Sequence, residues 1–282
     1  MKYISYFSAV LMLSFIFLGC NIINPAEKTP TYVHIDSFQF KGNYKLGTSS
    51  HKITNVTVIL DNNIVGIFDL PATVPVLADK KGVLAFTPGI TYSGLDDIQI
   101  AYPFYYTDTM TLMPEPGKTI TAHPTTGYYS DTILTAYQED FEGSNSLLLI
   151  TGDDTCVRTD DPNMVFEGDY SGHIHTNNEN ASELVLSNAF TLPQESYLEM
   201  NYKNTVPFVV GLQVMGSSSS DYVYYFYGFK PSDNWNKVYI GLQDILAQNP
   251  GTSYRIVIKV SAEEAVEGDI LLDNLKVIYR KS

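Results

Sequence analysis

The sequence predicts an all-β protein built from two β-sandwich domains. From Tyr32 onward, short runs of β-branched and aromatic residues alternate with turn residues, a pattern typical of short strands in sandwiches. Helical periodicity is confined to 242–248. Between Pro114 and Ala136 the composition shifts to Pro, Gly, Thr and Tyr, and proline disfavours regular central strands. The expected parts are an N-terminal β-sandwich (32–126), a linker (127–136) and a C-terminal β-sandwich (137–282).

The first twenty residues have the three parts of a secretory signal. Lys2 gives a positive start, an apolar run that is broken only by Ser14 extends from Val10 to Leu18, and Gly19 precedes Cys20. The run is shorter than the stretch of about 20 apolar residues that spans a bilayer, so we expect a cleaved signal peptide. Residues 17–20 (Phe-Leu-Gly-Cys) resemble the lipobox of bacterial lipoproteins. The resemblance implies that Cys20 carries acyl chains such as palmitate; the alternative is an ordinary cleaved signal with a chance cysteine.

Lipidation at Cys20 would hold the protein to a membrane of the bacterial cell envelope, and we expect the outer membrane. Residues 21–31 are polar and contain two prolines, which is typical of a flexible tether. Residues 21–24 lack the acidic run that signals surface export in some lipoprotein families, which favours the periplasmic face over the cell surface. Cys156 is the other cysteine of the sequence, so no intrachain disulfide is expected.

The net charge of −14 is unevenly distributed. Residues 137–282 hold 21 of the 31 Asp and Glu side chains. A surface of that sign repels the phosphates of nucleic acids and anionic lipids. We therefore expect no nucleic-acid partner. A cation or a neutral molecule is a more suitable ligand than an anion for the acidic residues 137–282.

The first sandwich contains a clear hairpin pattern. The strand-like run 56–60 leads through Asp61, Asn62 and Asn63 into the run 64–68, as a strand, a tight turn and a returning strand would. A further run, 83–86, ends before Pro88 and Gly89. Over about 40 residues this order resembles immunoglobulin-like or PEGA-like envelope sandwiches, which implies an immunoglobulin-like N-terminal domain.

The second sandwich carries three motifs in a characteristic order. They are Asp-Phe-Glu-Gly at 140–143, Glu-Gly-Asp-Tyr-Ser-Gly at 167–172 and Ile-Leu-Leu-Asp-Asn-Leu-Lys-Val at 270–277. Together they resemble the jelly rolls of galactose-binding-like and carbohydrate-binding modules. The resemblance implies a jelly-roll fold. It leaves the function open, because many members of this group bind sugars and others only dock proteins or serve as spacers in a multidomain chain.

The same resemblance implies a structural calcium ion. In such modules an acidic residue near the first strand and an aspartate on the last strand often share one. The corresponding residues are Asp140 or Glu142 and Asp273, and carboxylate oxygens are ligands that Ca²⁺ prefers. The alternative is that Asp273 caps a turn and Glu142 is solvated.

The aromatic run 222–229, followed by Trp235, is the candidate ligand site. Strict strand alternation places Tyr225 and Tyr227 on one face and Tyr224 on the other. Exposed aromatic rings bind sugars by stacking, so we expect Tyr225, Tyr227 and Trp235 to contact a glycan. The alternative is a structural role, because tyrosine and phenylalanine are also ordinary strand residues.

Two further patterns bear on chemistry. His173 and His175 would share one strand face, which suits a transition metal if a third ligand comes from elsewhere, although an unliganded surface pair has the same pattern. The sequence has no HExxH, GxSxG or Walker motif. We therefore expect a non-catalytic binding module, with a structural or assembly lipoprotein that contacts other envelope proteins as the alternative.

Overall fold

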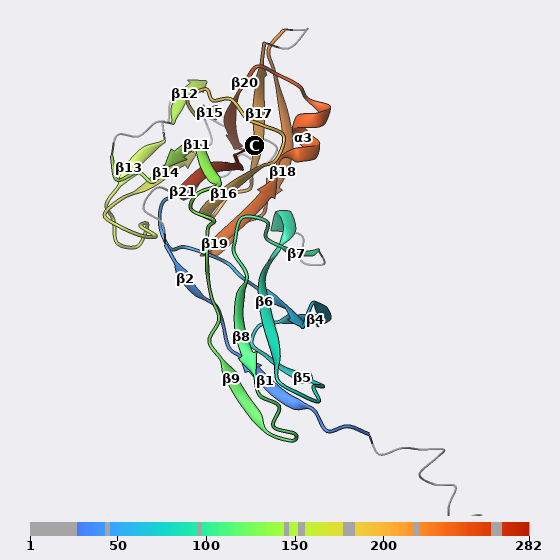
Figure 1. The fold of residues 1–282 in the computed structure, drawn as a ribbon. Helices are drawn as coiled ribbons and strands as arrows, with labels where there is room; N and C mark the ends of the chain where they lie inside the picture. Colours follow the sequence, from blue (N-terminus) through green and yellow to red (C-terminus); the bar gives the residue numbers. More distant parts are fainter. Residues whose placement is uncertain are drawn as a thin grey trace, which may run out of the picture.

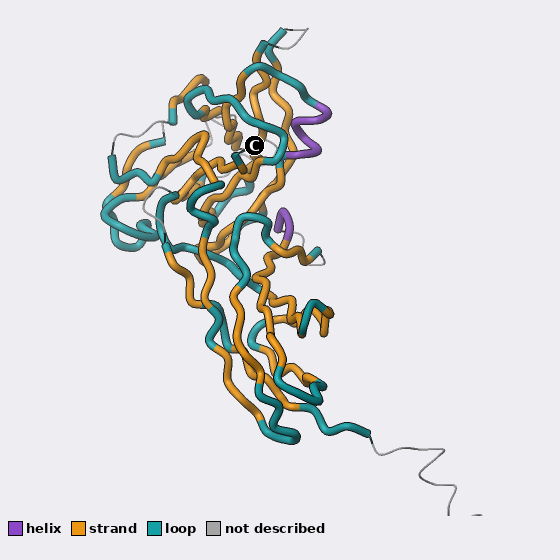
Figure 2. Tube along the Cα trace, viewed as in Figure 1, coloured by secondary structure: helices purple, strands orange, loops and turns teal. Residues whose placement is uncertain are grey.

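The computed structural model describes residues 27–42, 46–94, 98–143, 147–151, 156–176, 184–216, 220–260 and 267–281. Cys20, the signal peptide and most of the predicted tether lie outside these residues. The described chain forms two stacked lobes (Figure 1). Strands and loops make up almost all of it (Figure 2), which confirms the all-β class. Among the described residues, none of the helices has the length and hydrophobicity that spanning a bilayer requires.

The lower lobe is a β-sandwich. One sheet has the order β5-β1-β9, the other has the order β4-β3-β6-β7 with β8 also paired to β6, and β2 pairs with β10. Alternate side chains of the two sheets, such as Val33, Val74, Val58 and Phe86, meet in one buried core. The strands are β1 (Thr31–Ile35), β2 (Gln39–Lys41), β3 (Asn55–Leu60), β4 (Asn63–Asp69), β5 (Ala72–Val76), β6 (Gly82–Thr91), β7 (Gln99–Ala101), β8 (Asp108–Leu112), β9 (Thr119–Ala122) and β10 (Thr125–Gly127).

The predicted hairpin is present between β3 and β4. Leu60 pairs with Asn63, so the loop consists of two residues. Asp61 and Asn62 have φ values of 47° and 67°. Positive φ at both central residues defines the type I′ turn, whose twist matches that of the flanking strands. Aspartate and asparagine tolerate this conformation better than other non-glycine residues, which explains why the sequence signal was reliable here.

The upper lobe is the second β-sandwich. One sheet, called the β21 sheet, has the order β13-β14-β21-β16-β19 with β11 also paired to β21. The other, called the β17 sheet, has the order β12-β15-β20-β17-β18. The strands are β11 (Ile133–Glu139), β12 (Leu148–Thr151), β13 (Val157–Thr159), β14 (Ser171–Thr176), β15 (Leu184–Leu186), β16 (Ser196–Asn204), β17 (Phe208–Met215), β18 (Tyr222–Phe229), β19 (Ser232–Gly241), β20 (Ser253–Val260) and β21 (Gly268–Arg280).

The core of this sandwich lies between its two sheets and includes Leu198, Leu272, Leu212 and Ile256. The short helix α3 (Gln243–Gln248) covers one end of it, where helical periodicity was predicted, and buries Leu246. The short 3₁₀ turn η1 (Tyr92–Gly94) lies against β19.

The chain passes between the lobes at 129–132, directly after Tyr128, which pairs with Tyr105 of the lower lobe. β10 ends at Gly127 and β11 begins at Ile133, so the first residues of β11 fall within the predicted linker. β11 pairs with the last strand, from Ile133 opposite Arg280 to Glu139 opposite Leu275. The first and last strands of the upper sandwich are therefore neighbours, and Asp140 directly follows this pairing.

Candidate functional site

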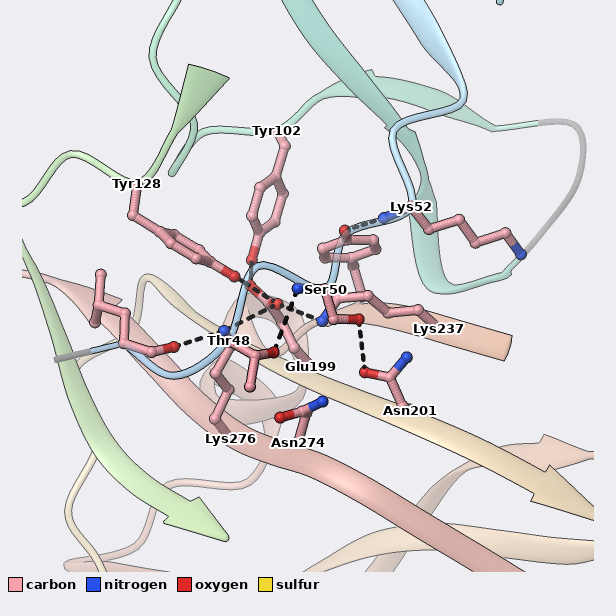
Figure 3. Close-up of polar contacts among 12 residues, drawn as sticks. Thr48, Ser50, Lys52, Tyr102, Tyr128, Glu199, Asn201, Lys237, Asn274 and Lys276 are labelled. Atoms are coloured by element: carbon pink, nitrogen blue, oxygen red, sulfur yellow. Dashed lines mark hydrogen bonds and ion pairs between the residues drawn. The ribbon is translucent and has the colours of Figure 1, made fainter. Parts of the chain in front are cut away.

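The junction between the two sandwiches is centred on a buried carboxylate. Glu199, on the outer face of β16, is 0% exposed. Its carboxylate accepts hydrogen bonds from the Tyr102 hydroxyl at 2.6 Å and from the Tyr128 hydroxyl at 2.8 Å, both in the lower lobe (Figure 3). The ammonium groups of Lys237 and Lys276 lie 3.2 and 3.6 Å from Oε2. The cluster therefore joins side chains from both sandwiches.

Electrostatics keep this carboxylate ionised. Burial alone would raise the pKa of Glu199, but Lys276, Lys237 and the two tyrosine hydroxyls outweigh that effect and lower it. Burial also lowers the pKa of Lys276 to about 8, although Glu199 acts in the opposite direction. A charge without water needs such partners. We assign the cluster a structural role, since it holds the lobes together.

Segment 46–52 adds further contacts across the junction. The Ser50 hydroxyl donates to Asn201 Oδ1 at 3.0 Å (Figure 3). The backbone N–H of Lys52 donates to the Tyr239 hydroxyl at 2.7 Å. Lys276 Nζ donates to the carbonyl of Leu46 at 2.8 Å. Sequence reasoning missed this cluster, because a glutamate on the outer face of a strand has the pattern of a solvated residue.

The predicted ligand residue Tyr225 lies on the outer face of the β17 sheet. Its strand, β18, is at the end of the sheet order. A β-bulge opposite Val210 and Gly211 makes Tyr225 the partner of Gly211 and Tyr227 the partner of Val210. Because Val210 belongs to the core and paired residues share a face, Tyr227 lies on the core side and Tyr225 points outward. Strict alternation does not hold here, so the two tyrosines do not share a face.

The Tyr225 side chain is 40% exposed and rests against the backbone of Gly211. A Cβ at position 211 would approach the Tyr225 ring to 3.0 Å and the carbonyl oxygen of Tyr224 to 2.6 Å. The missing side chain thus leaves room for the ring. Partial burial raises the pKa of the Tyr225 hydroxyl, so it stays protonated at neutral pH.

Polar side chains flank Tyr225 on the same outer face. Gln213 and Arg255 are paired across β17 and β20, one row of side chains away from the Gly211–Val257 pair. The Oε1 atom of Gln213 and the Nε atom of Arg255 are buried and make no hydrogen bond to any described residue. The Lys259 ammonium lies 5.6 Å from the centroid of the Tyr225 ring. Buried polar groups nearly always have a hydrogen-bond partner. These two atoms are exceptions, which means that this row of side chains has unused hydrogen-bonding capacity.

Trp235 lies in the other sheet of the sandwich, on β19, and is half-buried. Its ring packs against Phe166 with centroids 5.2 Å apart. The structure therefore separates Trp235 from the face that carries Tyr225.

The three predicted calcium ligands make hydrogen bonds within the protein. Asp273 is buried, and its carboxylate accepts from the Ser171 hydroxyl at 2.7 Å and from the N–H of Asn274 at 2.7 Å. Glu142 accepts from the N–H of Asp169 at 2.9 Å, and Asp140 accepts from the N–H of Glu142 at 3.2 Å. Burial raises the pKa of Asp273 to about 7. Its charged form is therefore costly without a cation.

Within the described ranges, one group of three or more His, Cys, Asp or Glu residues has ligand atoms within 4.8 Å of one another. It consists of His173, His175 and Asp269. The predicted histidine pair thus acquires a third polar partner from β21, which sequence reasoning did not identify.

A cleft of about 530 Å³ lies between the lobes on the side of α3 and η1. Its walls combine aromatic, acidic and basic side chains. Burial, together with the nearby Tyr92 and Glu195, raises the pKa of the Tyr197 hydroxyl to about 12. The lining includes Tyr92, Phe104, Glu195, Tyr197, Asp244 and Arg280.

Comparisons with known proteins give structural likeness only. No family model matches the sequence, and no curated protein matches it. A family 30 carbohydrate-binding module is similar at 16% identity and a TM-score of 0.41, covering 53% of this chain and 88% of the module. A family 11 module from Clostridium thermocellum, solved with a mixed-linked tetrasaccharide, gives 10% identity and a TM-score of 0.38, covering 54% and 98%. An enzymatically active domain of a bacteriophage CBA120 tailspike protein is similar at 15% identity and a TM-score of 0.39. This match covers 51% of the present chain and 21% of the tailspike chain.

Proposed function

We propose that this protein is a lipid-anchored bacterial envelope protein whose C-terminal sandwich binds a glycan without catalysing a reaction. The observation that carries the proposal is the outer face of the β17 sheet. There an exposed Tyr225 lies beside a row in which Gln213 and Arg255 have buried atoms without hydrogen-bond partners among the described residues. A flat aromatic surface beside unused polar groups suits a sugar, whose ring has an apolar face and a rim of hydroxyls.

Each side chain has a distinct part in this proposal. The Tyr225 ring stacks on the apolar face of a pyranose. Gln213 and Arg255 rotate on binding and expose their buried polar atoms, so that Gln213 Oε1 accepts a hydrogen bond from a sugar hydroxyl and Arg255 Nε donates one. Successive rows on one face are two residues apart along a strand, about 7 Å, so one sugar residue can contact both rows. Lys259 adds a flexible donor at the edge of the ring.

The anchoring part of the proposal rests on Cys20 and the residues before it. The start of the described chain, just before β1, lies at the end of the lower lobe that is remote from the upper lobe (Figure 1). A lipid attached upstream would therefore place the N-terminal sandwich near the membrane and hold the C-terminal sandwich away from it. We propose the periplasmic face of the outer membrane as the location.

A calcium ion shared by Asp273 and by Asp140 or Glu142 remains part of the proposal. Two observations support it. The pairing of β11 with β21 ends with Glu139 opposite Leu275, which brings Asp140 close to Asp273 on β21, and the buried Asp273 carboxylate has a raised pKa that a cation would lower.

The test of glycan binding uses two adjacent tyrosines. Tyr225→Ala should weaken retention of the full chain on immobilised polysaccharides several-fold, since stacking contributes about 1 kcal/mol. Tyr224→Ala is the matched control, because Tyr224 is 37% exposed on the same strand but pairs with the core residue Leu212. Equal binding by both variants, or no retention of the wild type on any polysaccharide, would exclude this site.

An assembly role is the second candidate, and the outer edge of the lower lobe favours it. β4 is the last strand of its sheet, and Ile64 and Ile67 on it are 71% and 56% exposed. Apolar side chains on an unpaired edge suit a partner that adds a strand. A photo-cross-linker at Ile64 should then capture one envelope protein, and Ile67→Lys should abolish the capture.

A further inference from the structure

We infer that His173, His175 and Asp269 form a binding site for a divalent transition-metal ion, with Zn²⁺ as the best fit. His173 Nε2 lies 2.7 Å from Asp269 Oδ1, and His175 Nδ1 lies 2.9 Å from the same oxygen. All three ligand atoms are within 4.8 Å of one another. The site is separate from Tyr225 and from Asp273, so it stands independently of glycan and calcium binding.

The strand register explains why these three residues meet. β14 and β21 are antiparallel, with His175 opposite Asp269 and His173 opposite Leu271. His173 and His175 are two residues apart and therefore share a face. Asp269 lies directly across from one and diagonally from the other, which places a carboxylate within reach of both rings.

The backbone around the site is held firmly. β14 is bonded to β13 on one side and to β21 on the other. The N–H of Asp269 donates to the Thr205 hydroxyl at 2.8 Å, and the carbonyl of Asp269 accepts from the N–H of Thr205 at 2.9 Å. Ligands fixed on paired strands lose little entropy on binding, which is what a preorganised metal site requires.

The donor set points to zinc rather than to a hard cation. Two imidazole nitrogens and one carboxylate oxygen are typical of Zn²⁺ sites with an open fourth position, whereas Ca²⁺ and Mg²⁺ prefer oxygen ligands alone. With bonds of about 2.0–2.2 Å, tetrahedral ligand atoms are about 3.3 Å apart. The two imidazole nitrogens lie a few tenths of an ångström closer than this to Asp269 Oδ1. Small side-chain rotations would therefore make room for the ion, which would replace the protons of the two hydrogen bonds.

The surroundings allow a cation to enter. The side chains of His173, His175 and Asp269 are 17%, 44% and 33% exposed. Glu267 Oε1 lies 3.9 Å from His175 Nε2 and adds negative charge. Lys203 lines the neighbouring shallow cleft together with Asp269. The carboxylates of Glu267 and Asp269 outnumber the single nearby ammonium group, so the local electrostatic potential is negative and attracts a divalent cation.

The test is isothermal titration of ZnCl₂ into the metal-free, untagged full-length protein. One Zn²⁺ should bind per chain at pH 7.5, and binding should weaken strongly at pH 5.5, because imidazole must lose its proton to ligate. His173→Gln and Asp269→Asn should each weaken binding by about tenfold or more. His34→Gln is the matched control, because His34 bonds to Thr73 on the lower lobe, and it should bind as the wild type does.

A measurement on the unaltered protein guards against variants that fail to fold. X-ray absorption of the zinc-loaded wild type should show two imidazole ligands and oxygen in the remaining positions. Absence of zinc binding by the wild type would overturn the inference, as would unchanged affinity in folded His173→Gln or a zinc coordination sphere without imidazole. In that case His173, Asp269 and His175 are a hydrogen-bonded ion-pair cluster only.

Discussion

The hydroxyl of Tyr128 donates a 2.8 Å hydrogen bond to Oε2 of Glu199, and this bond joins one sandwich to the other. The two residues are 71 positions apart. Lys276 completes the contact, because its ammonium group lies 3.6 Å from Glu199 and 4.5 Å from the centroid of the Tyr128 ring. Since all of these groups are buried, the position of each lobe depends on the other.

Removing the buried carboxylate should therefore be costly. Glu199→Ala leaves Lys237 and Lys276 buried without their counter-ion, and we expect a loss of about 3–5 kcal/mol in the free energy of unfolding. Tyr128→Phe removes one hydrogen bond to a charged group and should cost about 1.5–3 kcal/mol. Urea denaturation measures both. Glu195→Ala, an exposed neighbour, is the control and should change stability by less than about 0.5 kcal/mol.

Asp273 should make the stability fall as the pH rises. Burial raises its pKa to about 7 in the folded state, whereas an aspartate in an unfolded chain titrates near about 3.9. Between these pH values the folded protein holds a proton that the unfolded chain has lost. The contribution of Asp273 to the free energy of unfolding is therefore fully present below pH 4, decreases as the pH rises, and is lost by pH 7.

Asp273→Asn cannot lose that proton. Relative to wild type in chelator, the variant should gain stability between pH 4 and 7, by at most about 4 kcal/mol, since one pKa unit corresponds to about 1.4 kcal/mol. Denaturation at several pH values measures the difference. A stability difference that stays constant over this range would contradict the raised pKa.

Bound calcium should restore the folding stability that the protein loses when the buried Asp273 carboxylate is ionised. An ion that binds only the native state stabilises it by about 2.7 kcal/mol at a hundredfold excess over its dissociation constant. At pH 7.5 we expect added Ca²⁺ to raise the melting temperature of the metal-stripped protein, and Asp273→Asn to lack the rise. Mg²⁺ is the control ion. Identical melting curves with chelator and with calcium would remove the site.

Trp235 and Tyr225 should respond differently to truncation. Trp235 packs against Phe166 on the β21 sheet, so Trp235→Ala should lower stability by about 1–3 kcal/mol through lost apolar burial. Tyr225→Ala removes a ring that is 40% exposed and should lower glycan affinity more than stability. Thermal melts and polysaccharide affinity gels of the two variants give the comparison. A loss of binding in Trp235→Ala without a loss of stability would move the glycan site to the β21 sheet.

Cys20→Ala should abolish lipidation. The Phe-Leu-Gly-Cys run at 17–20 implies that this cysteine accepts the acyl chains, and the variant should remain unprocessed or leave the membrane fraction. Metabolic labelling with a palmitate analogue, followed by fractionation, measures both effects. Cys156→Ala is the control, because Cys156 is buried in the core of the upper sandwich and should not affect labelling. Absence of label in the wild type would argue for an ordinary cleaved signal.

Local sequence signals predicted the elements that depend on neighbouring residues. The Asp61-Asn62 turn between β3 and β4 and the short helix α3 lie where the residue patterns placed them. Both are determined by backbone preferences over a few residues. The all-β class follows in the same way, because alternation and turn spacing recur along the chain.

The sequence by itself thus determined the class of the fold, and the tertiary structure alone decided which side chains meet. Glu199 has the pattern of a solvated strand residue, yet the other lobe covers it. A single bulge moves Tyr227 to the core side while Tyr225 stays outside, and antiparallel register brings Asp269 to His173 across 96 residues. Such contacts depend on register and on domain packing. One residue of slip reverses the face of every side chain, so local pattern cannot specify them.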